Sequence, residues 1–330
     1  MKRFFAILVV IMLVAACQNE NNTNLTQASE QEKISDQFNI TTANADAVRF
    51  ENLAIFPVLA TEETPSNDWV GLEEALENER FRITEKKPYG RNDDSGAVNT
   101  LTVQNRSEDV VFMIPGDVVQ GGNQDRVIAQ HLVIPPRTIT DVTVFCVEKG
   151  RWSPREVEET EVQTEDNKIF AFRGYYNVAS NSIRKTLSTS KSQEEVWAKV
   201  ADITHKHNAD VATNAYAGLE SAEDFTNNRT AYLEHFASAF VGRDNVVGFV
   251  AVSGNEVIGA DIFSNADLFH KKFEALLHSY ITDALTTGEA VDLDQVKMKE
   301  YADYVAKALD KGEHTFKYEG EFVHFSNSME

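Results

Sequence analysis

Residues 246–263 read VVGFVAVSGNEVIGADIF, two apolar runs on either side of a Gly-Asn pair. Runs rich in Val, Ile and Phe are typical of buried strands, and a Gly-Asn pair between them is typical of a two-residue hairpin loop. A helical pattern follows, capped by Ser264 or Asn265, with an apolar stripe over residues 269–285. This part of the chain therefore predicts an antiparallel hairpin covered by a long helix.

The same two patterns alternate along the rest of the chain. A capping box at Ser192–Glu195 predicts one further helix, and residues 292–312 predict another, capped by Asp292. Strands interleaved with helices and linked by tight turns predict an α+β fold, a largely antiparallel sheet with packed helices, as a single domain over residues 47–330. Further strands are predicted at 54–59, at 98–103 and 110–114 as a hairpin, at 127–134, at 139–147, and at 315–318 and 321–325 as a second hairpin.

The N-terminus has the features of an export signal. Lys2 and Arg3 precede the apolar run Phe4–Ala16, which is shorter than the roughly 20 residues that span a bilayer. The run ends in Val-Ala-Ala before Cys17, like the lipobox of bacterial lipoproteins. Residues 1–16 are therefore predicted as a lipoprotein signal peptide. Cys17 is then the first mature residue, and its thiol carries the lipid, with acyl chains such as palmitate as the membrane anchor.

Residues 17–46 are predicted as the lipidated cysteine followed by a flexible tether. The segment is rich in Asn, Gln, Thr, Ser and Glu and contains few large apolar side chains, so burial cannot offset the entropy of ordering it. Gln18 follows Cys17, in place of the Asp that commonly marks inner-membrane retention in enteric bacteria. The expected location is the bacterial cell envelope, at the outer membrane in preference to the inner, facing the periplasm or the cell surface.

The chain is strongly acidic, with 52 Asp and Glu against 31 Lys and Arg and a net charge of −21. A nucleic-acid partner demands a basic face, so the charge argues against nucleic acid. It also argues against a domain that lies flat on anionic lipid, and the expected membrane contact is the lipid anchor. Protein partners stay unknown at this stage.

The chain has two cysteines. If Cys17 is acylated, Cys146 has no intrachain partner, and no disulfide framework is expected. Cys146 lies in the apolar run 142–147, which predicts a buried strand thiol. A catalytic cysteine needs a nearby base, and nothing local in the sequence supplies one.

The segment 116–126, GDVVQGGNQDR, contains the first candidate binding site. Gly121 and Gly122 could present backbone N–H groups to an anion, with Arg126 as a bidentate partner and Gln124 as a polar contact. No helical pattern follows the glycines, so the segment is neither a P-loop nor a dinucleotide fingerprint.

The alternative for this segment is a β-turn. In that interpretation the paired glycines supply positive φ angles, and Arg126 forms an ion pair with Asp117 or Glu148. The sequence leaves the binding site and the turn both open.

Glu148, Arg151 and Trp152 follow a predicted strand and form the second candidate. A carboxylate, a guanidinium and an indole are typical of a polar ligand pocket, and equally of a buried salt bridge under a tryptophan. Asp261 lies in an otherwise apolar strand, so its carboxylate is expected on the solvent face or in a pocket.

Known catalytic signatures are missing from the sequence, which contains neither G-x-S-x-G nor H-E-x-x-H. His205 and His207 form an H-x-H pair at a helix end, but two ligands without a supporting Cys or Glu do not define a zinc site. No metal ion and no cofactor are therefore predicted.

Residues 116–126 and the segment CVEKGRW at 146–152 resemble a domain family associated with ADP-ribosylglycohydrolases and rhodanese phosphatases. The hairpin 248–263 and the helix 268–284 fit the same family, and the resemblance covers residues 48–288. The function of the family is unassigned. The resemblance implies an association with ADP-ribose or NAD chemistry and supplies no catalytic residue.

Three functions stay open from the sequence. The first is an envelope-anchored binding module for a small polar or anionic ligand. The second is an enzyme that acts on a nucleotide-like, ADP-ribose-related or other anionic substrate at the same place, and the third is a structural interaction protein. The absence of a recognisable acid–base pair favours the binding module. The candidate ligand-binding residues are Gly121, Gly122, Gln124, Arg126, Glu148, Arg151, Trp152 and Asp261.

Overall fold

The computed structural model describes residues 33–86, 98–153, 171–292 and 294–328. The predicted signal peptide and the predicted lipidation site, Cys17, lie outside these residues. From Lys33 onward the chain forms one compact unit.

A seven-stranded antiparallel sheet forms the larger half of this unit. Its strands follow the order β1-β3-β13-β14-β16-β15, and β2 also pairs with β3. The strands are β1 (Phe38–Ile40), β2 (Val48–Phe50), β3 (Leu53–Ala60), β13 (Val246–Ser253), β14 (Glu256–Phe263), β15 (Thr315–Tyr318) and β16 (Glu321–Ser328).

A closed barrel forms the other half, with strand order β11-β6-β5-β12-β8-β9 and antiparallel pairing throughout. A short sheet, β10-β7-β4, accompanies it, and its β4–β7 pair is parallel. The strands are β4 (Val70–Gly71), β5 (Phe81–Glu85), β6 (Thr100–Asn105), β7 (Val111–Met113), β8 (Asp117–Gly121), β9 (Arg126–Ile128), β10 (Leu132–Ile134), β11 (Thr138–Cys146) and β12 (Ala171–Val178).

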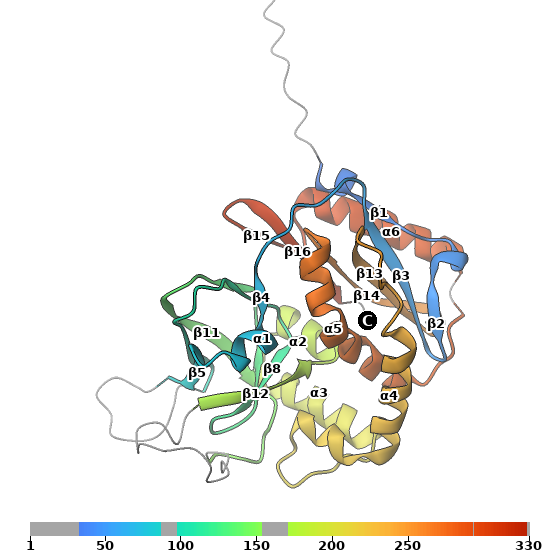
Figure 1. Ribbon diagram of the computed structural model, residues 1–330. Helices are drawn as coiled ribbons and strands as arrows, with labels where there is room; N and C mark the ends of the chain where they lie inside the picture. Colours follow the sequence, from blue (N-terminus) through green and yellow to red (C-terminus); the bar gives the residue numbers. More distant parts are fainter. Residues whose placement is uncertain (1–32, 87–97, 154–170, 293, 329–330) are drawn as a thin grey trace, which may run out of the picture. The chain divides into compact units, whose positions relative to one another are not determined.

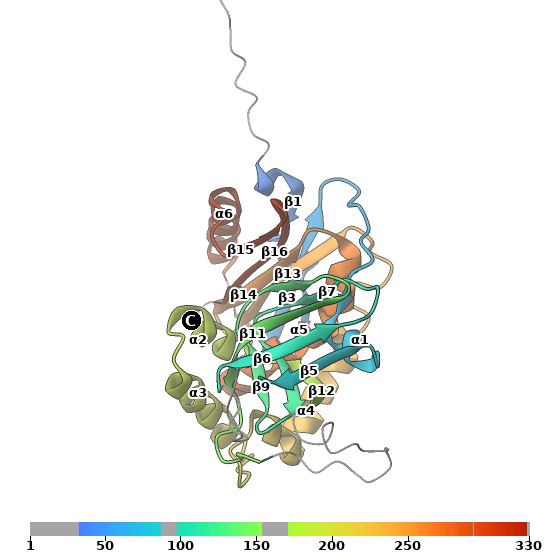
Figure 2. The same cartoon turned by 90° about the vertical axis from the view of Figure 1, so that its left-hand side faces the viewer.

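Helices cover the sheet and one side of the barrel (Figures 1 and 2). Apolar residues of α5 pack on one face of the seven-stranded sheet and those of α6 on the other, while α2 and α3 pack against the barrel. The α-helices are α1 (Leu72–Glu77), α2 (Asn181–Thr189), α3 (Gln193–Lys206), α4 (Glu223–Phe236), α5 (Ala266–Thr287) and α6 (Gln295–Lys311). The 3-10 helices are η1 (Ile34–Gln37), η2 (Asn44–Asp46) and η4 (Tyr216–Ser221). The α+β prediction, largely antiparallel with packed helices, is confirmed.

The predicted β13–β14 hairpin and the helix after it are present. Gly254 has φ +59°, which a two-residue loop of type II′ requires at its first position. The Asn265 side chain caps α5 by accepting a hydrogen bond from Leu268 N, and Gly288 ends the helix with φ +69°. Aromatic side chains of α5 then pack on Phe249 of β13, which fixes the helix on the sheet.

The predicted hairpin of residues 98–103 with 110–114 is wrong. β6 pairs with β5 and β11 in the barrel, whereas β7 pairs with β4 and β10 in the short sheet. The Asn105 side chain donates hydrogen bonds to Asp109 O, Ile134 O and Pro135 O, and so holds the chain where it passes from one sheet to the other. The predicted strand 127–134 is likewise divided between β9 and β10.

The predicted tether extends too far. Residues 33–46 already belong to the folded unit, because β1 pairs with β3 and Phe38 and Ile40 pack against the α6 face of the sheet. Three apolar side chains in a polar segment, Ile34 among them, are enough to dock it onto an existing sheet edge. The folded domain therefore begins near Lys33 instead of residue 47.

Two predicted helix caps can be compared with the structure. The Ser192 side chain accepts from Glu195 N, as a capping box requires. The cap of α6 is Asp294 and not Asp292, while Gly312 ends that helix with φ +72° as predicted. No helix among the described residues is long and apolar enough to cross a membrane.

Candidate functional site

The predicted residues of two segments, the glycine-rich segment 116–126 and the segment 146–152 that contains Glu148, Arg151 and Trp152, lie close together at one end of the barrel. Gln124 donates to Glu148 O at 2.7 Å and accepts from Arg126 Nη1 at 3.0 Å. Arg151 Nη2 lies 2.6 Å from Glu148 Oε2 and 3.2 Å from Asp125 Oδ1. These five side chains, together with Glu85, are called the Arg126 cluster below.

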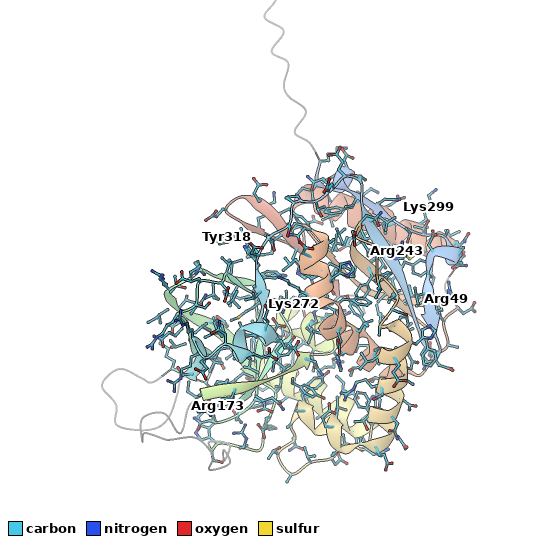
Figure 3. The ribbon with its side chains drawn as sticks, viewed as in Figure 1. Arg49, Arg173, Arg243, Lys272, Lys299 and Tyr318 are labelled. Atoms are coloured by element: carbon cyan, nitrogen blue, oxygen red, sulfur yellow. The ribbon has the colours of Figure 1, made fainter. Side chains whose placement is uncertain are left out.

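Arg126 is fully buried, and its carboxylate partner is Glu85 at 3.4 Å. The predicted partners are wrong: Glu148 pairs with Arg151, and Asp117 pairs with Lys272, whose Nζ lies 3.3 Å from Asp117 Oδ1. Lys272 reaches Asp117 from α5, between the sheet and the barrel (Figure 3). Barrel closure therefore decides which charges meet, and sequence spacing does not.

The paired glycines form a turn that strand packing imposes. Gly121 and Gly122 have φ +133° and +47°. A Cβ on Gly122 would lie 2.5 Å from the Phe172 ring and 2.7 Å from Glu85 Oε1, so no larger residue fits.

The backbone N–H groups of this turn are already used within the protein. Gly121 N donates to Asp125 Oδ1, Gly122 N to Ala171 O, and Asn123 N to Glu85 Oε1. Asp125 N donates to Glu148 Oε2. These four N–H groups are therefore not available to an incoming anion, and the geometry favours the β-turn over the anion cradle.

Glu148 is held as a carboxylate. Burial by itself raises its pKa, but hydrogen bonds from Arg151 and from Asp125 N–H outweigh burial and lower the pKa below its ordinary value. Arg151 also donates to the carbonyl oxygens of Gly121 and Gly122. Trp152 is 48% exposed, and its ring lies 5.9 Å from the Arg126 guanidinium carbon.

The cluster still contains unpaired polar atoms. Four buried side-chain atoms lack a hydrogen-bond partner among the described residues: Glu85 Oε2, Asn123 Nδ2, Arg126 Nε and Arg151 Nε. Each such atom reduces the net stability that the cluster contributes, because it has lost its hydrogen bonds to water without gaining one within the protein. With Arg126 fully buried, the cluster is a structural element of the barrel wall.

Asp261 does not join the Arg126 cluster. It lies on β14, faces α5 together with Phe263, and is neither on a solvent face nor in an open pocket. Arg184 of α2 binds it through both nitrogens, at 2.5 and 2.9 Å, and Tyr280 donates to it at 2.7 Å. His324 Nε2 faces Asp261 Oδ1 at 3.1 Å, off the ideal hydrogen-bond direction.

The Asp261 carboxyl is ionised as a result. Burial by itself raises its pKa, but the charge and hydrogen bonds of Arg184 outweigh burial and hold the pKa well below its ordinary value. Burial lowers the pKa of His324, which is fully buried and stacks on Phe263 with 4.1 Å between ring centroids.

A second histidine continues this arrangement. His131, between β9 and β10, has Nε2 at 2.7 Å from His324 Nδ1. Its ring stacks on Phe316 of β15 at 5.0 Å, which fixes its orientation. Burial, then His324 and Arg184, lower the pKa of His131 well below its ordinary value. Arg184, Asp261, Tyr280, His324 and His131 are called the Asp261 network below.

The Asp261 network borders a cavity of about 710 Å³, called the His131 cavity. It lies between the β9–β10 connection, α2 and the β15–β16 hairpin, where α2 lies beside the barrel and the sheet (Figure 2). Its polar walls include His131, Arg184, Lys191, His314, Ser326 and Asn327. The described residues that line it include no Asp or Glu.

Sequence reasoning missed the residues that make up this region. Arg184 is separated from Asp261 by 77 positions and His131 from His324 by 193, so no spacing rule connects them. The available signal was Asp261 itself, a carboxylate in an apolar strand, which demands a buried cation.

Cys146 is a free, buried thiol, as predicted. Burial raises its pKa to about 11, so it stays protonated at neutral pH. The Gln193 side chain bonds both backbone groups of Cys146 and joins α3 to the barrel. Among the described residues, no three His, Cys, Asp or Glu side chains are grouped as a metal ion requires.

Residues 42–325 match the ARG and Rhodanese-Phosphatase-superfamily-associated Protein domain, and the chain belongs to this family. The match begins after β1 and ends within β16, so it covers the barrel, the helices α1 to α6 and most of the seven-stranded sheet. Neither the comparison with curated proteins nor the comparison with solved structures finds a match.

Proposed function

We propose that this protein is an envelope lipoprotein whose domain binds a small anionic ligand in the His131 cavity. One observation carries the proposal: the lining includes Lys191, Arg184 and two histidines but no described carboxylate, in a chain with a net charge of −21. Such local charge raises the concentration of an anion at the site against the field of the whole protein.

The size and lining of the cavity support a small molecule. About 710 Å³ lies within the range of ligand pockets, roughly 300–1,000 Å³. Apolar side chains such as Phe145 and Leu187 share the walls with the polar groups, as in sites that bind a ring and a charged group together. Because Asp261 already compensates the charge of Arg184, Lys191 supplies the exposed positive charge.

Isothermal titration of the purified domain tests the binding. ADP-ribose and inorganic phosphate serve as anionic probes, and ribose serves as the neutral control. The proposal expects binding of an anion that weakens as salt rises, and no binding of ribose. Equal heats from ADP-ribose and ribose, or no heat from either anion, would contradict it.

Replacing Cys17 tests the anchor. The proposal expects Cys17→Ser to remain unprocessed and to lose incorporation of labelled palmitate, because the thiol carries the lipid. Cys146→Ser is the matched control and should be labelled like the wild type. A processed, palmitate-labelled Cys17→Ser protein would contradict the lipoprotein assignment.

A further inference from the structure

The geometry points to an enzymatic role for the His131 cavity. We propose that His131 is the general base of the cavity, positioned by His324 and Asp261, and that the cavity hydrolyses a phosphate ester. This inference rests on the proposed function, because it needs an anion in the same place.

The positions of the ring protons on His324 and His131 can be assigned by starting from the ionised Asp261 carboxylate. Asp261 is paired with Arg184 and can only accept. The nitrogen of His324 that faces it, Nε2, therefore carries the proton, and Nδ1 of the neutral ring is bare. His131 Nε2 lies 2.7 Å from that bare nitrogen and so donates to it.

The same reasoning leaves His131 with a bare Nδ1. His131 is partly exposed and lines the cavity, and its Nε2 is used by the buried His324. Nδ1 is thus the nitrogen that remains for a group in the cavity. Stacking on Phe316 and Phe112 prevents the ring from turning away, so the base is preorganised.

The charges around His131 favour a neutral ring, which can accept a proton, over a permanently protonated one. Arg184 and Asp261 are the charged groups of the network that act on it, and they largely compensate each other. A proton that arrives at Nδ1 leaves an imidazolium whose Nε2–H still faces His324 Nδ1, and Asp261 is the group of the network that favours the charged ring. This is the relation between base and orienting group that acid–base catalysis uses.

The reaction that uses these groups is attack of water on phosphorus. As the water oxygen bonds to phosphorus, its proton passes to His131 Nδ1, and the ester P–O bond breaks. The departing oxygen leaves on the side opposite the attacking water and takes its proton from solvent. His131 then releases its own proton to solvent, so the enzyme returns to its starting state. Lys191, an exposed cation on the wall of the cavity, is the group that would hold the phosphate oxygens.

Hydrolysis of bis(4-nitrophenyl) phosphate and 4-nitrophenyl phosphate tests the proposal. Wild-type protein should release 4-nitrophenol, and His131→Gln should lower kcat about 10²–10⁴-fold, the usual contribution of a general base. His205→Gln, an exposed histidine on α3, is the matched control and should retain the wild-type rate. Wild-type release no faster than that of His131→Gln would overturn the proposal.

A second measurement does not depend on turnover. Nitrogen-resolved NMR of the histidine rings at pH 6.5 should show neutral His131 with its proton on Nε2, and His324→Gln should abolish that preference. A charged His131, or a proton on Nδ1, would overturn the relay. If the anion binds in titration but neither ester is hydrolysed, the enzymatic role fails while the binding function stands.

Discussion

The Arg126 cluster of the barrel and the Asp261 network of the seven-stranded sheet both place an arginine against buried carboxylates. In the cluster the backbone N–H groups of Gly121 and Asn123 are bound by carboxylates of the protein. Arg126 is fully buried, and its ion pair is a single contact of 3.4 Å. In the network Arg184 binds Asp261 twice, and the chain of side chains continues through His324 to a cavity. A buried pair of arginine and carboxylate is therefore structural in the Arg126 cluster, whereas in the Asp261 network it lies behind His131, which lines a cavity. The difference between the two regions is access from the cavity.

The largest stability loss should come from the Asp261 network. Asp261→Ala leaves the buried Arg184 charge without its bidentate partner, and the free energy of unfolding should fall by about 4–5 kcal/mol. Urea unfolding measures it. The Asp261→Leu/Arg184→Met double variant should recover a large part of the loss, because no charge is then stranded. A loss below about 1 kcal/mol for the single variant would show that the pair is not the centre of this region.

The Arg126 cluster should respond less. Arg126→Ala should cost about 3 kcal/mol, because Glu85 loses one contact at 3.4 Å and the cluster already contains unpaired atoms. Its affinity for an anion should match the wild type. Unchanged urea unfolding together with lost anion binding would reverse the roles that we assign to the two regions.

Asp283 shows what a buried carboxylate does when Ser182 holds it instead of a guanidinium. Burial raises its pKa to about 6, above the ordinary 3.8, although hydrogen bonds from Ser182 oppose the shift. The folded state therefore binds this proton more tightly, and the resulting stability is full below about pH 3.8 and lost as pH rises through 6.

Asp283→Asn should remove that pH dependence. The difference in unfolding free energy between wild type and variant should shift by roughly 2–3 kcal/mol between pH 4 and pH 7, against the wild type at the higher pH. Urea unfolding at four pH values measures it. Parallel curves would mean that Asp283 titrates normally.

The smallest expected loss of stability concerns the glycine pair, where it tests whether Gly122 is part of a packed β-turn or of an anion-binding loop. Gly122→Ala meets Phe172 and Glu85 at a positive φ, and should cost roughly 1–3 kcal/mol. Gly242→Ala is the control, because its φ is +73° but nothing lies within 4 Å of the new Cβ, so only backbone strain of about 1 kcal/mol remains. Equal thermal shifts for the two variants would argue that Gly122 is not packed as described.

Local patterns predicted the parts of the fold that local physics decides. The Gly-Asn loop, the caps at Asn265 and Ser192 and the apolar stripe of α5 each depend on residues a few positions apart. The barrel was not predicted, because its closure joins β9 to β11 and divides two apparent neighbours, β6 and β7, between sheets. That partition depends on contacts such as Asn105 with Ile134, which no spacing pattern encodes.

The candidate site divides in the same way. Seven of the eight predicted residues meet because β9 pairs with β11, which brings the turn before β9 next to the segment after β11. Glu85, the carboxylate partner of Arg126, comes from β5. Asp261 was recognised as unusual, yet its arginine and its histidine lie far away in sequence. The sequence therefore indicated that Asp261 is a buried charge, but it did not indicate which residues pair with it.

The central claim is that an anion binds at the His131 cavity and not at the Arg126 cluster. Titration of ADP-ribose into Lys191→Glu and Trp152→Ala tests it directly, because both side chains are exposed and each belongs to one of the two regions. We predict that Lys191→Glu weakens binding at least tenfold, through charge reversal at the cavity, while Trp152→Ala stays within twofold of the wild type. Loss of binding in Trp152→Ala with full binding in Lys191→Glu would contradict the account.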